Sequence, residues 1–75
     1  MYIVKYTHTY NGPRGTIPSS VEVDTALEAD TLASGIARIA EIDRVDWTKS
    51  DIEFIAPYID EDRCISVEFI SIEEE

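Results

Sequence analysis

Residues 2–23 read YIVKYTHTYNGPRGTIPSSVEV, and this stretch decides the fold that we expect. Side chains alternate across residues 2–10, with Tyr, Val and His on one side of the backbone and Ile, Lys and Thr on the other, as in a β-strand. Residues 11–15 concentrate turn formers and include two glycines that are free to adopt positive φ. A second alternation covers residues 17–28, with Ile17, Val21, Val23 and Leu27 on one side and Glu22, Asp24 and Glu28 on the other. Two alternating runs joined by five turn residues predict a β-hairpin.

An amphipathic helix follows the hairpin. Leu32, Ile36 and Ile39 form a stripe at positions i, i+4 and i+7, and neighbouring alanines add helix propensity. Gly35 weakens the helix by about 1 kcal/mol relative to Ala, and we interpret it as permitting close approach of the helix to a sheet. We expect the helix to end near residues 42–43.

Two residues are candidates for the N-cap of this helix. Thr25 and Glu28 have the spacing of a capping box, in which each side chain bonds a backbone N–H near the other. Asp30 is an equally good N-cap. Because the period-two pattern of the preceding strand continues through Ala29, we expect the later start, at Asp30.

The remainder of the chain predicts two further strands. Residues 51–59 alternate, and Pro57 marks an edge or a bulge there because proline cannot donate to a β-ladder. A turn at residues 60–63 leads into a fourth strand, residues 64–72, and residues 73–75 are interpreted as a solvated tail. One face of the fourth strand should carry Ile65, Val67 and Phe69.

The element order ββαββ predicts an α+β fold with a four-stranded, mainly antiparallel sheet and one helix packed on one face. With 75 residues, the chain forms a single domain, residues 1–75, with a small core. The covered face and the helix should form this core from Val4, Tyr6, Val21, Val23, Leu27, Phe54, Val67, Phe69, Leu32, Ile36 and Ile39. The uncovered face should carry Lys5, Thr7, Thr9, Glu22, Asp24, Glu53, Ser66 and Glu68.

The charge balance excludes several classes of function. Sixteen acidic residues against six basic ones give a formal net charge of -10. Affinity for nucleic acids and for anionic membranes depends on clustered Lys and Arg, so we expect neither as a direct partner. No apolar run approaches the roughly 20 residues of a membrane span, and the N-terminus lacks the pattern of a signal peptide. The sequence therefore predicts a soluble protein of the cytoplasm.

The chain carries no catalytic or metal-binding motif. A single Cys64 rules out an internal disulfide and a Cys-based zinc site, and a single His8 rules out most acid–base and metal constellations. We interpret His8 as a packing or surface residue and Cys64 as a small hydrophobic residue at a strand start. The acidic turn at residues 60–62 lacks the spaced ligands and the glycine of a calcium loop. We therefore expect no enzyme, no metal and no cofactor.

The acidity itself is the main functional signal. The competing explanation is that the charge serves only solubility. A net charge of about 8 in magnitude is the upper end of what solubility requires of a small domain, so solubility leaves part of the charge of -10 unexplained. Outward residues on a strand repeat about every 6.6–6.8 Å, and the phosphates of one DNA strand advance about 3.4 Å along the axis per step. Carboxylates at alternate strand positions can therefore imitate a row of phosphates, as any acidic amphipathic strand could.

Apolar residues are also expected on the open face. Ile55 and Ile70, together with Ile3 and Ile72, fall on this face or near it if the register is as predicted. Several such residues on adjacent strands would form a patch of the kind that marks protein–protein contacts, whereas a register slip of one residue would turn them inward. Ile55, Ile70, Trp47 and Tyr10 are the available anchors for a specific partner.

Small size, strong acidity, one compact α+β domain and the lack of a catalytic motif resemble phage-encoded inhibitors of host defence, of the anti-CRISPR and DNA-mimic type. The resemblance covers the whole chain in size and charge and rests on no sequence motif. It implies an inhibitor in the host cytoplasm that occupies a basic nucleic-acid-binding protein or complex. The residues that we expect to contact this partner are Glu22, Asp24, Glu28, Glu53, Asp60, Glu61, Asp62, Glu68, Ile55 and Ile70.

A second function class fits the same sequence. The chain would then be a structural or interaction module that forms a homodimer, or docks on a larger subunit, through its open sheet face. The oligomeric state separates the two hypotheses, since a homodimer that buries the open face favours the module.

Overall fold

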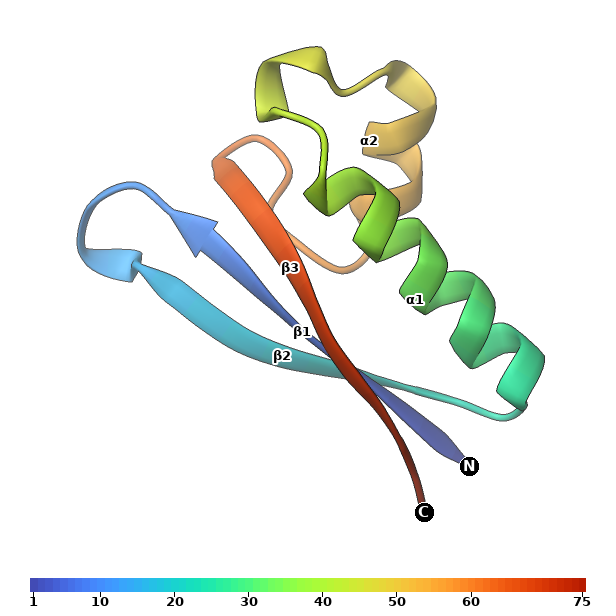
Figure 1. Cartoon of the computed structure of the whole chain (residues 1–75). Helices are drawn as coiled ribbons and strands as arrows, with labels where there is room; N and C mark the ends of the chain where they lie inside the picture. The colour runs from blue at the N-terminus through green and yellow to red at the C-terminus, as the bar shows by residue number, and fades with distance from the viewer.

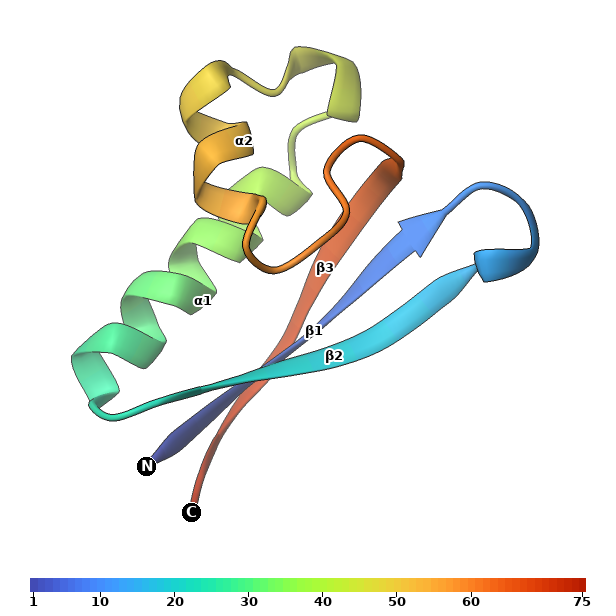
Figure 2. The same cartoon turned by 180° about the vertical axis from the view of Figure 1, so that it is seen from behind.

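A computed structural model describes all 75 residues (Figure 1). Three antiparallel strands form a sheet of order β2-β1-β3, and two α-helices lie beside it (Figures 1 and 2). The α+β class is therefore confirmed, whereas the prediction of four strands and one helix is wrong. Neither helix combines the length and the apolar composition that a membrane crossing requires. The elements are β1 (Tyr2–Tyr10), β2 (Thr16–Val23), α1 (Ala26–Ala40), α2 (Lys49–Ile55) and β3 (Cys64–Glu74).

The predicted hairpin is present and supplies the central strand. β1 and β2 pair along their lengths, and the connection closes with a hydrogen bond from Tyr10 N–H to the Gly15 carbonyl oxygen at 2.8 Å. Gly12 and Gly15 have φ of 80° and 59°, a conformation that favours glycine, as the turn was expected to require. Every second residue of β1 from Val4 to Tyr10 is buried, so one face of the sheet is covered.

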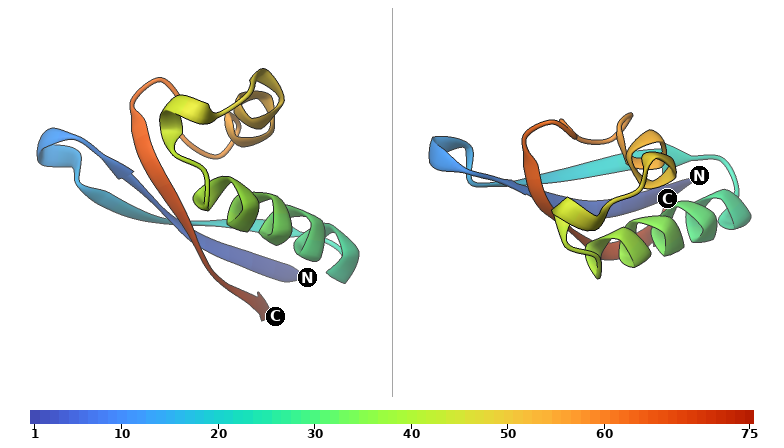
Figure 3. Two further views of the ribbon diagram at one scale, coloured as in Figure 1. Left: turned by 45° about the horizontal axis from the view of Figure 1, so that its top comes forward. Right: turned by 90° about the horizontal axis from the view of Figure 1, so that it is seen from above.

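The helices lie on this covered face, with α1 against β3 and β1 (Figure 3). The stripe predicted for the helix is confirmed, because Leu32, Ile36 and Ile39 are all buried. Tyr6 donates from its hydroxyl to the Tyr58 carbonyl oxygen at 2.6 Å, which fixes the segment after α2 to the sheet. Of the other predicted core residues, Val4 and Val67 are buried, and the half-buried ones pack at the edge of the core: Val21, Val23, Phe54 and Phe69.

α1 begins earlier than expected. Thr25 is its N-cap, because the Thr25 hydroxyl oxygen accepts a hydrogen bond from Glu28 N–H at 3.1 Å. The Glu28 carboxylate in turn accepts from Asp24 N–H at 3.4 Å. The predicted start at Asp30 is wrong, since satisfying the free N–H groups of the first turn outweighs continued strand alternation. As a result Leu27 lies in the first turn and is 75% exposed, although we expected it in the core.

The predicted third strand is a helix. Thr48 and Asp51 form a capping box, in which the Thr48 hydroxyl accepts from Asp51 N–H at 3.2 Å and the Asp51 carboxylate accepts from Thr48 N–H at 3.0 Å. Arg38 of α1 also pairs with the buried Asp51 at 2.8 Å. This local signal starts α2, and Pro57 follows shortly after its end, where proline is common. The apparent alternation of residues 51–59 therefore misled the strand prediction.

Two β-bulges change the phase of β3. Cys64 lies opposite Tyr10 and Ser66 opposite Thr9, so Ile65 is an extra residue; a second register shift leaves Ile70 extra in the same way. Both extra side chains are exposed, at 42% and 51%. Because of the bulges, successive inward residues of β3 are three, two and three positions apart. Ile65 was predicted to share the inward face with Val67 and Phe69, and this prediction is wrong because Ile65 is exposed. The inward residues are Cys64, Val67, Phe69 and Ile72.

The last residues of the chain belong to the sheet. Glu73 lies opposite Ile3 and Glu74 opposite Tyr2, and Glu75 N–H donates to the Met1 carbonyl oxygen at 2.9 Å. The interpretation of residues 73–75 as a free tail is therefore wrong. Backbone pairing with β1 holds these glutamates in place.

Candidate functional site

Acidic residues of β2, β3 and the start of α1 lie at the end of the sheet where both termini lie (Figure 1). Glu22 of β2 and Glu73 of β3 lie opposite Ile3 from its two sides, so all three share the open face. Asp24 directly follows β2, and Glu28 is in the first turn of α1. We call this region the acidic end, and it consists of Glu22, Asp24, Glu28, Glu73, Glu74 and Glu75.

Strand pairing fixes the backbone positions of the acidic residues on β2 and β3. Adjacent strands lie about 4.8 Å apart, so the backbones of Glu22 and Glu73 are separated by roughly 10 Å across β1. Lys5 pairs with Glu73 at 2.6 Å, but both side chains are about half exposed, and this ion pair neutralises only one member of the acidic end. The remaining carboxylates form no ion pair within the chain, so this end carries a concentrated negative potential.

An apolar groove opens beside the acidic end. Its volume is about 400 Å³, and Glu28 lies on its wall. The rings of Phe54 and Tyr58 lie 6.1 Å apart in its lining, and the exposed Leu27 lies at the same place. Apolar side chains thus adjoin fixed carboxylates, which is the combination that a specific interface with a charged partner needs. The lining residues are Val23, Leu27, Glu28, Thr31, Leu32, Phe54 and Tyr58.

The predicted acidic contact residues do not form one surface. Glu22, Asp24 and Glu28 lie together at the acidic end, and Glu68 lies on the open face opposite Thr7 of β1. Glu53 is on α2 and not on the sheet, so its predicted place on the open face is wrong. Asp60, Glu61 and Asp62 lie in the turn before β3, near Tyr10 and therefore at the opposite end of β1.

The predicted isoleucine patch does not exist. Ile55 is fully buried in the core, because residues 49–55 are helical and not a strand. Ile70 remains exposed at its bulge, while Ile3 and Ile72 are half-buried, the latter against the core. Two other expected anchors, Trp47 and Tyr10, are buried as well. Leu27 is instead exposed beside the groove. The capping-box spacing of Thr25 and Glu28 was the sequence signal that could have revealed this exposure.

His8 is part of a buried hydrogen-bond network. Its Nδ1 lies 2.7 Å from the Tyr10 hydroxyl and its Nε2 lies 2.7 Å from the Ser19 hydroxyl. The Tyr10 hydroxyl also accepts from Asp60 N–H at 2.9 Å, so it is free to donate its own proton to Nδ1. Burial, with a smaller contribution from Arg14, lowers the pKa of His8. The network holds the turn at Asp60 against the sheet.

Cys64 is buried at the start of β3. Its thiol lies 3.1 Å from the Ser66 carbonyl oxygen, to which it donates, and burial raises the pKa of the thiol. A raised pKa reduces the thiolate fraction and with it the reactivity of this cysteine. No group of three or more His, Cys, Asp or Glu side chains comes together in a way that could hold a metal ion.

Comparisons with protein-family models, curated proteins and solved structures find no significant match to this chain. The site is therefore interpreted from its own geometry.

Proposed function

We propose that this chain is an acidic inhibitor of a nucleic-acid-binding protein or complex, of the anti-CRISPR type, and that it acts in the cytoplasm of the host cell. It would present carboxylates where the partner expects phosphates. The observation that carries the proposal is the acidic end, where Glu22, Asp24, Glu28 and Glu74 lie together and form no ion pair within the chain. Binding alone suffices for this mechanism, because occupying the basic site excludes the nucleic acid.

The arrangement of the acidic residues supports mimicry of phosphates. Glu22 and Glu73 lie on the two strands that flank β1, with their backbones roughly 10 Å apart, so the acidic end presents an extended array of carboxylates and not a single acidic point. Strand pairing fixes the backbone that carries these two groups, so little backbone order has to be created on binding. The unpaired charges would also accelerate encounter with a basic groove, in a way that added salt weakens.

The apolar groove would supply specificity. Exposed charge pairs contribute about 0–1 kcal/mol each, so carboxylates alone would bind many basic proteins weakly. An apolar side chain of the partner in the groove, in contact with Leu27 and Phe54, would select among them. The contact surface that we propose therefore combines the acidic end with the groove.

The alternative is an interaction module that pairs through its open sheet face. One observation favours it: the open face has no helix on it, and Ile70 is exposed at a bulge on the same strand as Glu68. Pairing through the sheet edges is less suited to such a module, because Pro18 lies on β2 and two bulges interrupt β3. Light scattering on the wild type and on Ile70→Glu tests this alternative, which requires a dimer that the substitution dissociates.

The experiment for the main proposal is capture from host-cell lysate, with and without excess duplex DNA. The test variant carries Glu22→Lys, Asp24→Lys and Glu74→Lys, whose native side chains make no ion pair in the chain. The control carries Glu41→Lys, Asp43→Lys and Asp46→Lys, an equal change of charge at exposed positions after α1. A partner that wild type and control capture, that DNA displaces and that the test variant loses supports the proposal. A partner retained by all three proteins in the presence of DNA contradicts it.

A further inference from the structure

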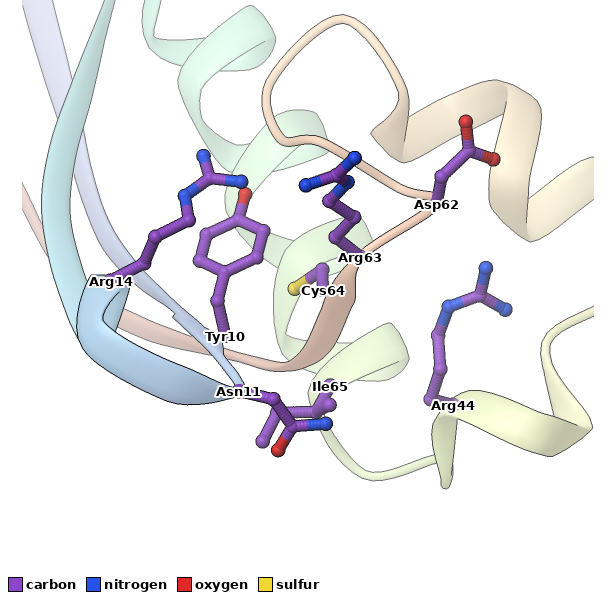
Figure 4. Close-up of a pocket in the computed structure, with 8 residues that line it drawn as sticks. All are labelled: Tyr10, Asn11, Arg14, Arg44, Asp62, Arg63, Cys64 and Ile65. Atoms are coloured by element: carbon purple, nitrogen blue, oxygen red, sulfur yellow. The ribbon is translucent and has the colours of Figure 1, made fainter.

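A second pocket lies at the end of the sheet opposite the acidic end. Its volume is about 430 Å³, and it is formed by the β1–β2 turn, the segment after α1 and the start of β3 (Figure 4). Three of the six basic residues of this strongly acidic chain line it. The lining residues are Tyr10, Asn11, Arg14, Arg44, Asp62, Arg63, Cys64 and Ile65.

Two of the three arginines are held in place by the protein. The Arg14 guanidinium carbon lies 4.0 Å from the centre of the Tyr10 ring, and Arg14 pairs with Asp60 at 3.1 Å. Arg44 donates from Nε and Nη2 to the Glu61 carbonyl oxygen at 3.1 and 2.6 Å, and its guanidinium carbon lies 4.8 Å from the centre of the Trp47 ring. These contacts leave Nη1 of Arg44 free, and they fix both groups before any ligand arrives.

Arg63 has no such structural role. Its side chain makes no hydrogen bond and no ion pair, and Figure 4 shows it between Arg14 and Asp62. The nearby carboxylates do not neutralise it, because neither Glu61 nor Asp62 lies within ion-pair distance of any arginine. With Arg14 committed to Asp60, the lining keeps two positive charges, on Arg44 and Arg63, against the single negative charge of Asp62.

We infer that this pocket binds a small organic phosphate, whose phosphate group is held by Arg63. Guanidinium groups from three separate chain segments line the pocket, and such groups suit a tetrahedral anion with several oxygens, which can accept from more than one direction. The volume exceeds that of an inorganic ion and falls in the lower range of small-molecule sites. Ile65, turned outward by its β-bulge, offers an apolar wall for the organic part. This inference is independent of the acidic end.

Titration followed by backbone amide NMR tests the inference, with adenosine monophosphate as the probe and inorganic phosphate, adenosine and citrate as comparisons. We expect the monophosphate to shift the amides of residues 63–65 and to bind more tightly than adenosine. Arg63→Gln should weaken binding by about tenfold, as for the loss of a charge-assisted hydrogen bond, while Lys49→Gln, an equal loss of charge outside the pocket, should leave it unchanged.

Four outcomes would overturn the inference. They are no shifts at residues 63–65 up to about 10 mM monophosphate, equal binding of adenosine, equal weakening by Lys49→Gln, and tighter binding of citrate than of either phosphate. Light scattering at the same concentrations tests whether the acidic end of a second copy of the chain occupies the pocket instead. Association of the free protein that Arg63→Gln abolishes would assign the pocket to that contact and not to a phosphate.

Discussion

The ring of Phe54 lies directly against the Cα of Gly35. A Cβ placed on Gly35 would lie 2.7 Å from Cε1 and 2.9 Å from Cε2 of this ring, and closer still to Cζ. Real Cβ atoms do not approach other atoms so closely, so the Phe54 ring can occupy this position only because residue 35 lacks a side chain. The same ring lines the apolar groove, so this contact positions part of the proposed interface.

We expect Gly35→Ala and Phe54→Ala to be strongly coupled. Alanine in place of glycine in a helix interior normally stabilises by about 1 kcal/mol, but here it displaces the Phe54 ring, and overpacking of this kind costs about 1–3 kcal/mol. In the Phe54→Ala background the substitution should recover its stabilising effect. Urea unfolding of the four proteins measures the coupling energy, which should reach at least about 1 kcal/mol. Additive effects would show that the two residues are not in contact.

The stability of the protein should depend on the protonation of His8. Burial lowers the pKa of His8 in the folded state, so the unfolded chain binds this proton more readily. The contribution of neutral His8 is complete above its ordinary pKa of about 6.5 and is lost as the pH falls from there to the lowered folded value. Between pH 7.5 and pH 5.5, the free energy of unfolding of the wild type should therefore fall relative to that of His8→Gln. An identical difference in the two proteins would contradict this prediction.

The capping box at the start of α2 should contribute measurably to stability. Thr48→Ala removes the acceptor for Asp51 N–H and should lower the free energy of unfolding by about 1 kcal/mol. The Thr48 backbone N–H and Arg38 lower the pKa of the Asp51 carboxyl, so its contribution should be lost only as the pH falls below about 3.8. Ser50→Ala, at an exposed position in the same turn, serves as the control and should change stability little.

The two halves of the chain differ in how well the sequence predicts them. The hairpin was predictable because Tyr2–Tyr10 alternates without interruption and two turn glycines follow it. The strand predicted in the second half is wrong because residues 51–59 fit both a helix and a strand, and the capping box from Thr48 to Asp51 favours the helix. The bulges at Ile65 and Ile70 had no local signal, since register shifts arise from pairing with β1.

The candidate site was predictable only in part. Glu22, Asp24 and Glu28 were identified from charge, and they do lie at one end of the molecule, but their predicted place on the second strand is wrong for Asp24, which follows β2, and for Glu28, which is in α1. The contribution of Glu73 and Glu74 was missed because an acidic terminus resembles a free tail, and only pairing with Tyr2 and Ile3 fixes it. The groove and the arginine-lined pocket join segments far apart in sequence, so neither could be inferred from spacing.

Leu27 should affect partner binding and not stability. It is 75% exposed at the groove, so Leu27→Ser should change the free energy of unfolding by less than about 0.5 kcal/mol. The matched substitution in the same helix, Leu32→Ala, removes a buried side chain and should cost about 2–5 kcal/mol. Affinity for a partner obtained by capture should fall with Leu27→Ser. Unchanged affinity would exclude the groove from the interface.

The most direct test of the proposed function is competition for the partner between this protein and labelled duplex DNA, followed by fluorescence anisotropy over a range of salt concentrations. Wild type and the control with three reversals at residues 41–46 should displace the DNA, and the affinity of the protein should fall steadily as salt increases. The variant reversed at Glu22, Asp24 and Glu74 should not displace it. If the partner binds DNA and this protein simultaneously, or if the affinity stays constant from low to high salt, phosphate mimicry is not the mechanism.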